Sequence, residues 1–165
     1  MKTCLAFDQS SDKTGIALII ESQPTVCRVK WAVSIETPDS NALLDNFPWM
    51  KMTGFNPDII AHEEGFVSNT IRHAGLVIAT TGGWVEMLRS VYFRYARLHH
   101  AMATTWRQAV WGDGKMPREV AKDYSIQFAV AHGITDPDDH MGDAIGIGMW
   151  ALGEDRKIKT NGGTI

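Results

Sequence analysis

The stretch that most constrains the fold runs from Cys4 to Ile20 and reads CLAFDQSSDKTGIALII. An apolar run ends at Asp8, a short polar segment follows, and a second apolar run begins at Gly15. Two apolar runs separated by turn-forming residues predict a β-hairpin, here with strands over residues 2–8 and 14–21. The Asp8 carboxylate then ends a buried strand, where a turn residue, a phosphate-binding loop or a metal ligand would each explain it.

The rest of the chain alternates between predicted strands and helices. Further strands are expected over residues 25–37, 58–63 and 97–104. Helical patterns cover residues 41–52, 68–89, 104–112, 117–133 and 135–153. This order predicts an α/β domain, with a five-stranded mixed sheet flanked by helices on both faces. We expect this domain to span residues 1–153, and residues 154–165 to form a polar, flexible tail.

Cap residues mark the ends of the last three predicted helices. Thr and Asp favour N-caps, Pro favours the first turn, and Gly favours the C-terminal end. These preferences predict helix starts at Thr104 or Thr105, at Pro117, and at Asp136 followed by Pro137. They predict helix ends at Gly112 and Gly133.

Composition places the chain among ordinary soluble proteins. It has 165 residues, of which 44% are hydrophobic and 21% charged, as expected for one globular domain. Cys4 and Cys27 lie in apolar runs and form no Cys-x-x-Cys motif, which predicts buried thiols in a reducing compartment. No apolar run has the length of a membrane span, and Met1 leads into a strand without a signal-peptide layout. We therefore expect a cytoplasmic protein with no membrane partner.

One segment of the chain has a charge of the opposite sign to the net charge. The whole chain carries −3, but residues 89–122 contain seven Lys or Arg against two Asp or Glu, a local balance of +5. A basic segment on an acidic chain can still bind phosphates, because binding depends on the local field. A solvated helix face is the alternative interpretation.

Four side chains suggest a metal site. Asp8 and Glu63 each end a predicted strand, and His140 and Asp143 are three residues apart on the last helix, with Cβ atoms about 5–6 Å apart. Such ends meet at one edge of an α/β sheet, where sites collect. Clustered oxygens suit hard divalent cations, and phosphoryl-transfer enzymes often hold two ions roughly 3.5–4 Å apart. A solvated Asp143 is the alternative, but the apolar AIGIGMWALG that follows makes an unpaired carboxylate costly.

Four segments in order resemble the RuvC family of Holliday-junction resolvases, over about residues 2–152. FDQSSDKTGIALI resembles the family's opening segment, with Ser10 where the family has glycine. PDIIAHEEGF is similar to the segment with the catalytic glutamate, and HMGDAIGIGMWA to the closing helix. TWRQAVWGDGKMPREVAK is similar to the basic segment. The compact chain is compatible with a bacteriophage member.

The resemblance implies a ribonuclease H-like fold and a two-metal endonuclease. Asp8, Glu63, His140 and Asp143 would be catalytic and would bind two Mg²⁺ ions, or Mn²⁺ in their place. Asp8 would bridge the ions, and His140 would ligate an ion or orient the attacking water. DNA contacts would come from Phe66 stacking on an unpaired base and from the basic side chains Arg107, Lys115, Arg118 and Lys122. Core packing remains the alternative for Phe66, and the tryptophans beside Arg107 are core or DNA-facing candidates.

The implied reaction is the resolution of four-way junctions in DNA recombination and repair. Paired symmetric nicks would leave 5′-phosphate and 3′-hydroxyl ends. The two-fold symmetry of a junction favours a homodimer, and the helix after Glu63 resembles the family's dimer helix.

Three other functions stay open. The same fold serves nucleases that act on flaps or RNA–DNA hybrids, and a catalytically weak junction-binding protein would keep the DNA contacts alone. AFDQSS also resembles the phosphate loop of sugar-kinase and actin-like ATPases. That class needs two such domains and Gly-rich adenosine motifs, and 165 residues supply one domain without those motifs.

Overall fold

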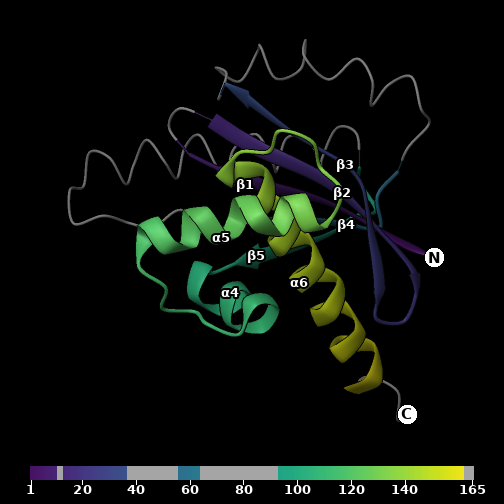
Figure 1. Ribbon diagram of the computed structural model, residues 1–165. Helices are drawn as coiled ribbons and strands as arrows, with labels where there is room; N and C mark the ends of the chain where they lie inside the picture. The colour runs from purple at the N-terminus through teal and green to yellow at the C-terminus, as the bar shows by residue number, and fades with distance from the viewer. Residues whose placement is uncertain (11–12, 37–55, 64–92, 162–165) are drawn as a thin grey trace, which may run out of the picture.

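Five strands form one mixed sheet in the computed structural model, which describes residues 1–10, 13–36, 56–63 and 93–161 (Figure 1). The strands are β1 (Lys2–Gln9), β2 (Lys13–Gln23), β3 (Val26–Glu36), β4 (Ile59–Glu63) and β5 (Arg97–Ala101). Their order is β3-β2-β1-β4-β5, antiparallel from β3 to β1 and parallel from β1 to β5. The predicted hairpin and mixed five-stranded sheet are confirmed.

Three described helices pack together against one face of this sheet (Figure 1). They are α4 (Ala103–Trp111), α5 (Arg118–Ala131) and α6 (Asp139–Asn161). The long α6 crosses β1, β2 and β4, and α4 and α5 lie against it. The helices predicted over residues 41–52 and 68–89 lie outside the described residues. No helix in the described ranges combines the length and apolarity needed to cross a bilayer.

The central strand β1 is apolar on both faces. Cys4, Leu5, Ala6 and Phe7 are fully buried. Cys4 and Ala6 face the helices, while Leu5 and Phe7 pack into a second cluster on the opposite face. Burial on both faces explains the continuous apolar run that the sequence shows before Asp8.

Ser10 closes the β1–β2 hairpin with backbone and side chain. Its N–H and its hydroxyl both donate to the carbonyl oxygen of Lys13, each at 2.9 Å, and the Lys13 N–H donates to Ser10 Oγ at 3.1 Å. Ser10 is not among the described non-glycine residues with positive φ. A serine therefore fits where the RuvC pattern has glycine, because the turn needs no left-handed backbone there.

Two predicted helix starts were wrong. Helix α4 begins at Ala103, one residue after the extended Met102, so neither Thr104 nor Thr105 is its N-cap. Strand β5 ends at Ala101, three residues earlier than predicted, and Met102 is the single residue between it and α4. Helix α6 begins at Asp139, and the carboxylate of Asp138 accepts the Met141 N–H at 3.0 Å. Asp138 is therefore the N-cap in place of Asp136, which has a φ of 52°.

The predicted glycine ends of α4 and α5 are confirmed. Gly112 and Gly133 both have a φ of 83°. At the end of α5 the Gly133 N–H donates to Val130 O at 2.9 Å, and the Ile134 N–H donates to Ala129 O at 3.1 Å. This pair of bonds is a Schellman motif, which satisfies the last helix carbonyls. Pro117 stands one residue before α5 rather than inside its first turn.

Helix α6 continues to Asn161, past the predicted end at Gly153. The reason is an ion-pair group at the edge of the sheet where β1 and β5 begin. Asp155 is fully buried and pairs with Lys2 Nζ at 2.5 Å and with Arg97. Because a buried charge needs partners, these contacts hold the polar end of the helix against the sheet.

Candidate metal centre

The carboxylates of Asp8, Glu63 and Asp143 meet at one edge of the sheet. Strands β1 and β4 are parallel neighbours paired as far as Phe7 and His62, so the next residue of each strand lies at the same edge. Asp143 reaches this edge from the second turn of α6. One ligand oxygen from each of the three side chains lies within 4.8 Å of the others. The structure therefore brings together three of the four predicted ligands as a compact oxygen cluster.

Glycine 15 allows α6 to begin at this edge. Gly15 pairs with Asp8 across the hairpin, and a Cβ atom on it would lie 2.0 Å from the carbonyl oxygen of His140. Any side chain at position 15 would therefore push the first turn of α6 away from Asp8. This close approach is the structural use of the glycine that begins the second apolar run.

His140 adjoins the cluster through Asp8. Its Nδ1 lies 2.6 Å from Asp8 Oδ2, and this hydrogen bond raises the pKa of His140. The carboxylates of Asp139 and Asp138 act in the same direction. One ring nitrogen of His140 is thus bound to a carboxylate of the cluster. An imidazole can support a carboxylate site in this way without ligating a metal ion itself.

Burial and a neighbouring charge raise the pKa values of Glu63 and Asp143. Burial, and then the charge of Asp8, raise the pKa of Glu63 from 4.5 to about 8. The same two causes raise the pKa of Asp143 from 3.8 to about 7. Burial and repulsion disfavour the deprotonated form of these carboxylates. A cation placed among their oxygens would stabilise that form.

Helix α4 supplies two donors to the cluster. The indole N–H of Trp106 donates to Glu63 Oε2 at 2.7 Å, and Arg107 Nη2 donates to Asp143 Oδ2 at 2.9 Å. The Arg107 guanidinium also lies over the Trp106 ring, 5.1 Å from its centroid. Sequence reasoning named Arg107 only as a phosphate contact and gave Trp106 no role at Glu63. The one sequence signal for a role at the cluster was that both residues directly follow the fifth predicted strand.

The donor set fits a divalent metal ion. Asp143 Oδ1 is buried and has no hydrogen-bond partner among the described residues. The hydroxyl of Ser125 donates instead to the carbonyl oxygen of Asp139 at 2.6 Å. A buried carboxylate oxygen without a partner, on a residue clustered with two other carboxylates, is available to an ion, and all-oxygen ligands suit Mg²⁺ or Mn²⁺.

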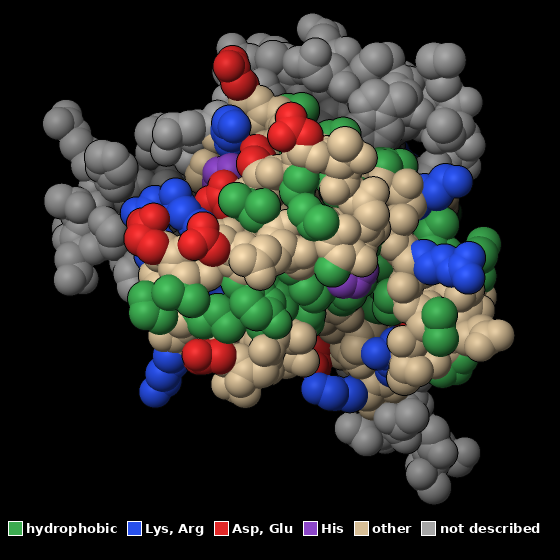
Figure 2. Space-filling view, viewed as in Figure 1, with side chains coloured by type: hydrophobic (Ala, Val, Ile, Leu, Met, Phe, Trp, Pro, Cys, Tyr) green, Lys and Arg blue, Asp and Glu red, His purple; other side chains and the backbone are tan. Residues whose placement is uncertain are grey.

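The described members of the predicted DNA-binding set have three different environments. Lys115 and Arg118 are exposed around the start of α5, where Figure 2 shows basic and acidic side chains side by side. Lys122 is half-buried and its Nζ lies 3.7 Å from Asp139 Oδ2. Arg107 contacts Asp143, as described above. Phe66 and the predicted dimer helix lie outside the described residues.

Comparison with known proteins identifies the fold. No protein-family model and no curated protein sequence matches this chain. Thermus thermophilus RuvC is similar over 94% of this chain and 96% of its own, with a TM-score of 0.65 and 14% identity. The fold is that of RuvC. The same protein in complex with a Holliday junction substrate covers 93% of this chain and 97% of its own, with a TM-score of 0.71 and 14% identity.

A solved structure of a different protein agrees with this assignment. The yeast mitochondrial Holliday junction resolvase Ydc2 is similar over 96% of this chain and 81% of its own, with a TM-score of 0.60 and 12% identity. The predicted resemblance to RuvC is therefore confirmed for the fold, a ribonuclease H-like α/β sheet. With so little sequence identity, the activity has to be argued from the site.

Proposed function

We propose that this protein is a metal-dependent endonuclease that resolves four-way DNA junctions. The observation that carries the proposal is the cluster of Asp8, Glu63 and Asp143, whose oxygens lie within 4.8 Å at the edge of a RuvC-type sheet. The similar solved structures support the choice of substrate, since they include RuvC in complex with a Holliday junction substrate and a fowlpox virus resolvase with junction DNA.

Asp8, Glu63 and Asp143 would hold the metal. Bound divalent ions supply a water activated for attack on a phosphodiester and stabilise the leaving oxygen. Asp8, whose charge acts on both other carboxylates, would hold two Mg²⁺ ions together with Glu63 and Asp143, and Mn²⁺ would substitute for Mg²⁺. Because Asp8 engages Nδ1 of His140, Nε2 is the nitrogen left to bind an ion or to orient the attacking water.

The remaining predicted contacts complete the proposal. Lys115, Arg118 and Lys122 would hold backbone phosphates, with Arg107 reaching DNA from its place beside Asp143, and Phe66 would stack on an unpaired base. A homodimer would match the two-fold symmetry of the junction and cut both strands. The paired nicks would leave 5′-phosphate and 3′-hydroxyl ends.

A cleavage assay with a synthetic four-way junction tests this function. Wild-type protein with Mg²⁺ or Mn²⁺ should nick the junction at symmetric positions, and the products should be joined by DNA ligase. Asp8→Asn removes the central ligand charge, so it should bind the junction and reduce cutting at least about 100-fold.

Parallel substrates separate the other candidate functions. A wild-type protein that cuts flaps or RNA–DNA hybrids and ignores four-way junctions would show that the nuclease has another substrate. A protein that binds junctions tightly but never cuts them with either metal would be a binding protein. Tight ATP binding without DNA binding would point to the ATPase class.

A further inference from the structure

We propose that Trp106 is a positioning residue of the metal centre, with its indole N–H holding the Glu63 carboxylate in the orientation that binds metal. This inference deepens the proposed function and rests on it for the reaction that the metal serves. The Trp106 Nε1 to Glu63 Oε2 distance is 2.7 Å, a strong geometry for a bond to a carboxylate.

The chemistry of the indole sets the direction of this bond. The indole nitrogen of tryptophan donates and cannot accept, so Oε2 of Glu63 is always the acceptor. A carboxylate tied at one oxygen keeps the other for an ion. Without that bond the terminal torsion of a glutamate is broad, and its oxygens would turn among several orientations.

The tryptophan ring is itself held firmly. Trp106 is fully buried and packs edge-to-face with the Trp111 ring, with the centroids 4.6 Å apart. On α6, a Cβ atom on Gly146 would lie 2.5 Å from the Trp106 ring. The absence of a side chain at Gly146 therefore leaves the space that the Trp106 ring occupies, and any larger residue would fill it. The helix that positions Asp143 also positions the donor to Glu63.

The backbone links the donor to its acceptor by a short path. Glu63 pairs with Ala101 across the parallel strands β4 and β5. Helix α4 begins two residues after Ala101, so Trp106 lies in its first turns, directly beside the end of β4. The indole and the carboxylate are thus fixed to neighbouring strand ends, which is how supporting residues orient metal ligands.

Trp111 supplies a matched control. It is nearly buried in the same aromatic cluster, but its indole nitrogen has no hydrogen-bond partner among the described residues. Trp106→Phe and Trp111→Phe therefore remove the same atoms from one cluster, and only the first removes a bond to a ligand.

The test measures Mn²⁺ binding by electron paramagnetic resonance, with no DNA present. Trp106→Phe should weaken Mn²⁺ binding about 10-fold or more, and Trp111→Phe should leave it within about 2-fold of wild type. In cleavage assays Trp106→Phe should raise the metal concentration needed for half-maximal rate and leave KM for the junction unchanged.

Two results from this pair of variants would overturn the positioning role. One is a Trp106→Phe protein that binds Mn²⁺ as wild type does. The other is an equal loss of affinity in both variants, which would make packing the cause. If Trp106→Phe does not fold, benzothienylalanine at position 106 replaces the N–H with sulfur in a ring of the same shape. Unchanged Mn²⁺ affinity in that protein would overturn the role as well.

The role of Trp106 and the proposed function can fail independently in these experiments. A wild-type protein that binds Mn²⁺ but cuts no branched DNA would end the nuclease proposal, and the comparison of affinities would still decide the role of Trp106. A wild-type protein that binds no Mn²⁺ would overturn both.

Discussion

At the scale of single residues, Glu63 and Asp143 should make the candidate metal centre sensitive to pH. Burial and the charge of Asp8 raise their pKa values to about 8 and about 7. The hydrogen bond to Asp8 also raises the pKa of His140. The folded protein therefore binds protons that the unfolded chain has already released at the same pH. The free energy of unfolding should fall as the pH rises from about 4 to about 8.

This linkage predicts a metal effect that grows with pH. Without metal, the melting temperature should be lower at about pH 8 than at about pH 5, because the carboxylates must charge within the fold. Added Mg²⁺ binds the deprotonated cluster, so its stabilising effect should be small at about pH 5 and large at about pH 8. Differential scanning fluorimetry with and without Mg²⁺ measures both trends.

Asp143→Asn is the control for this prediction. It removes one of the crowded charges, so the melting temperature should change less with pH and Mg²⁺ should stabilise the protein less. An unchanged pH slope in this variant would mean that other groups cause the trend.

Single residues also show how far sequence reasoning reached. The sequence alone predicted the carboxylates of Asp8, Glu63 and Asp143. A carboxylate at the end of an apolar run is unusual, and such a placement is visible without a structure. Trp106 was missed because a buried tryptophan is ordinary in sequence, and its hydrogen bond exists only once β4 and β5 are paired.

At the scale of elements, α6 holds the site together through its glycines. A Cβ atom on Gly142 would lie 2.0 Å from the backbone oxygen of Ser125 in α5. A Cβ on Gly148 would lie 2.3 Å from the end of the Ile19 side chain in β2. The helix can therefore approach both a neighbouring helix and the sheet, and that approach sets where Asp143 stands.

Gly142→Ala should destabilise the protein by about 1–3 kcal/mol, because the clash is with backbone that cannot turn away. Gly153→Ala is the matched control in the same helix. Its Cβ would meet only Arg156 Nη2 at 3.5 Å, so the better helix propensity of alanine should stabilise the protein by about 0.5–1 kcal/mol.

Urea unfolding of the two glycine variants against wild type measures these changes. Equal effects from Gly142→Ala and Gly153→Ala would show that helix propensity, and not close packing, decides the outcome.

The helix boundaries show where local signals fail. Asp136 before Pro137 has the local pattern of a helix start, yet Asp138 caps the helix because its carboxylate reaches the Met141 N–H. The end of α6 was placed too early because Glu154 and the residues after it are polar. Their helix is stabilised by Asp155 pairing with Lys2 and Arg97, residues far away in sequence.

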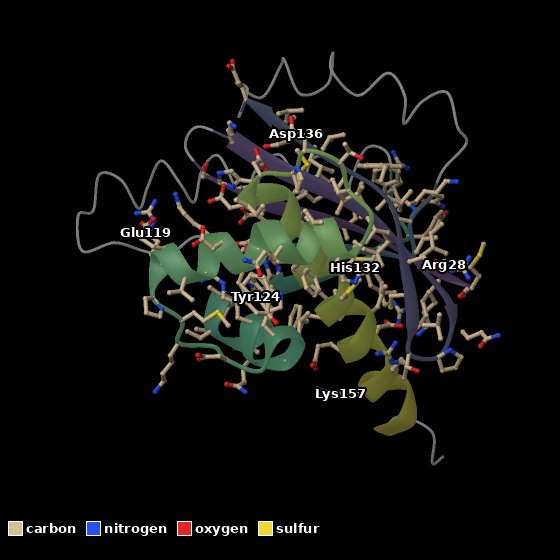
Figure 3. All side chains as sticks on the ribbon, viewed as in Figure 1. Arg28, Glu119, Tyr124, His132, Asp136 and Lys157 are labelled. Carbon is tan, nitrogen blue, oxygen red and sulfur yellow. The ribbon has the colours of Figure 1, made fainter. Side chains whose placement is uncertain are left out.

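At the scale of the whole molecule, phosphate binding has to overcome a net charge of −3. Lys115 and Arg118, the exposed cations at the start of α5, are two of the residues that the proposal assigns to DNA. Figure 3 shows Glu119, at this end of α5, and Arg28, on β3, at opposite sides of the view. This separation allows a comparison in which the net charge changes equally at two places.

Lys115→Ala with Arg118→Ala should weaken junction binding and reduce the slope of log affinity against log salt by about 1.8, or about 0.9 for each phosphate contact. Arg28→Ala with Lys30→Ala removes the same charge from the exposed side of β3 and should leave that slope nearly unchanged. Fluorescence anisotropy with a labelled junction at several salt concentrations measures both. Equal losses in the two proteins would mean that net charge alone governs binding.

The sequence by itself determined the strands, their hairpin, the approximate positions of the three described helices and the carboxylates of the candidate site. Those features depend on local patterns of apolar and polar residues, which burial and hydrogen bonding impose along the chain. The tertiary structure alone decided which donors reach the cluster, how closely α6 approaches the sheet, and where that helix begins and ends. These features depend on pairs such as Trp106 with Glu63 and Lys2 with Asp155, whose members meet only after the strands have been ordered in space.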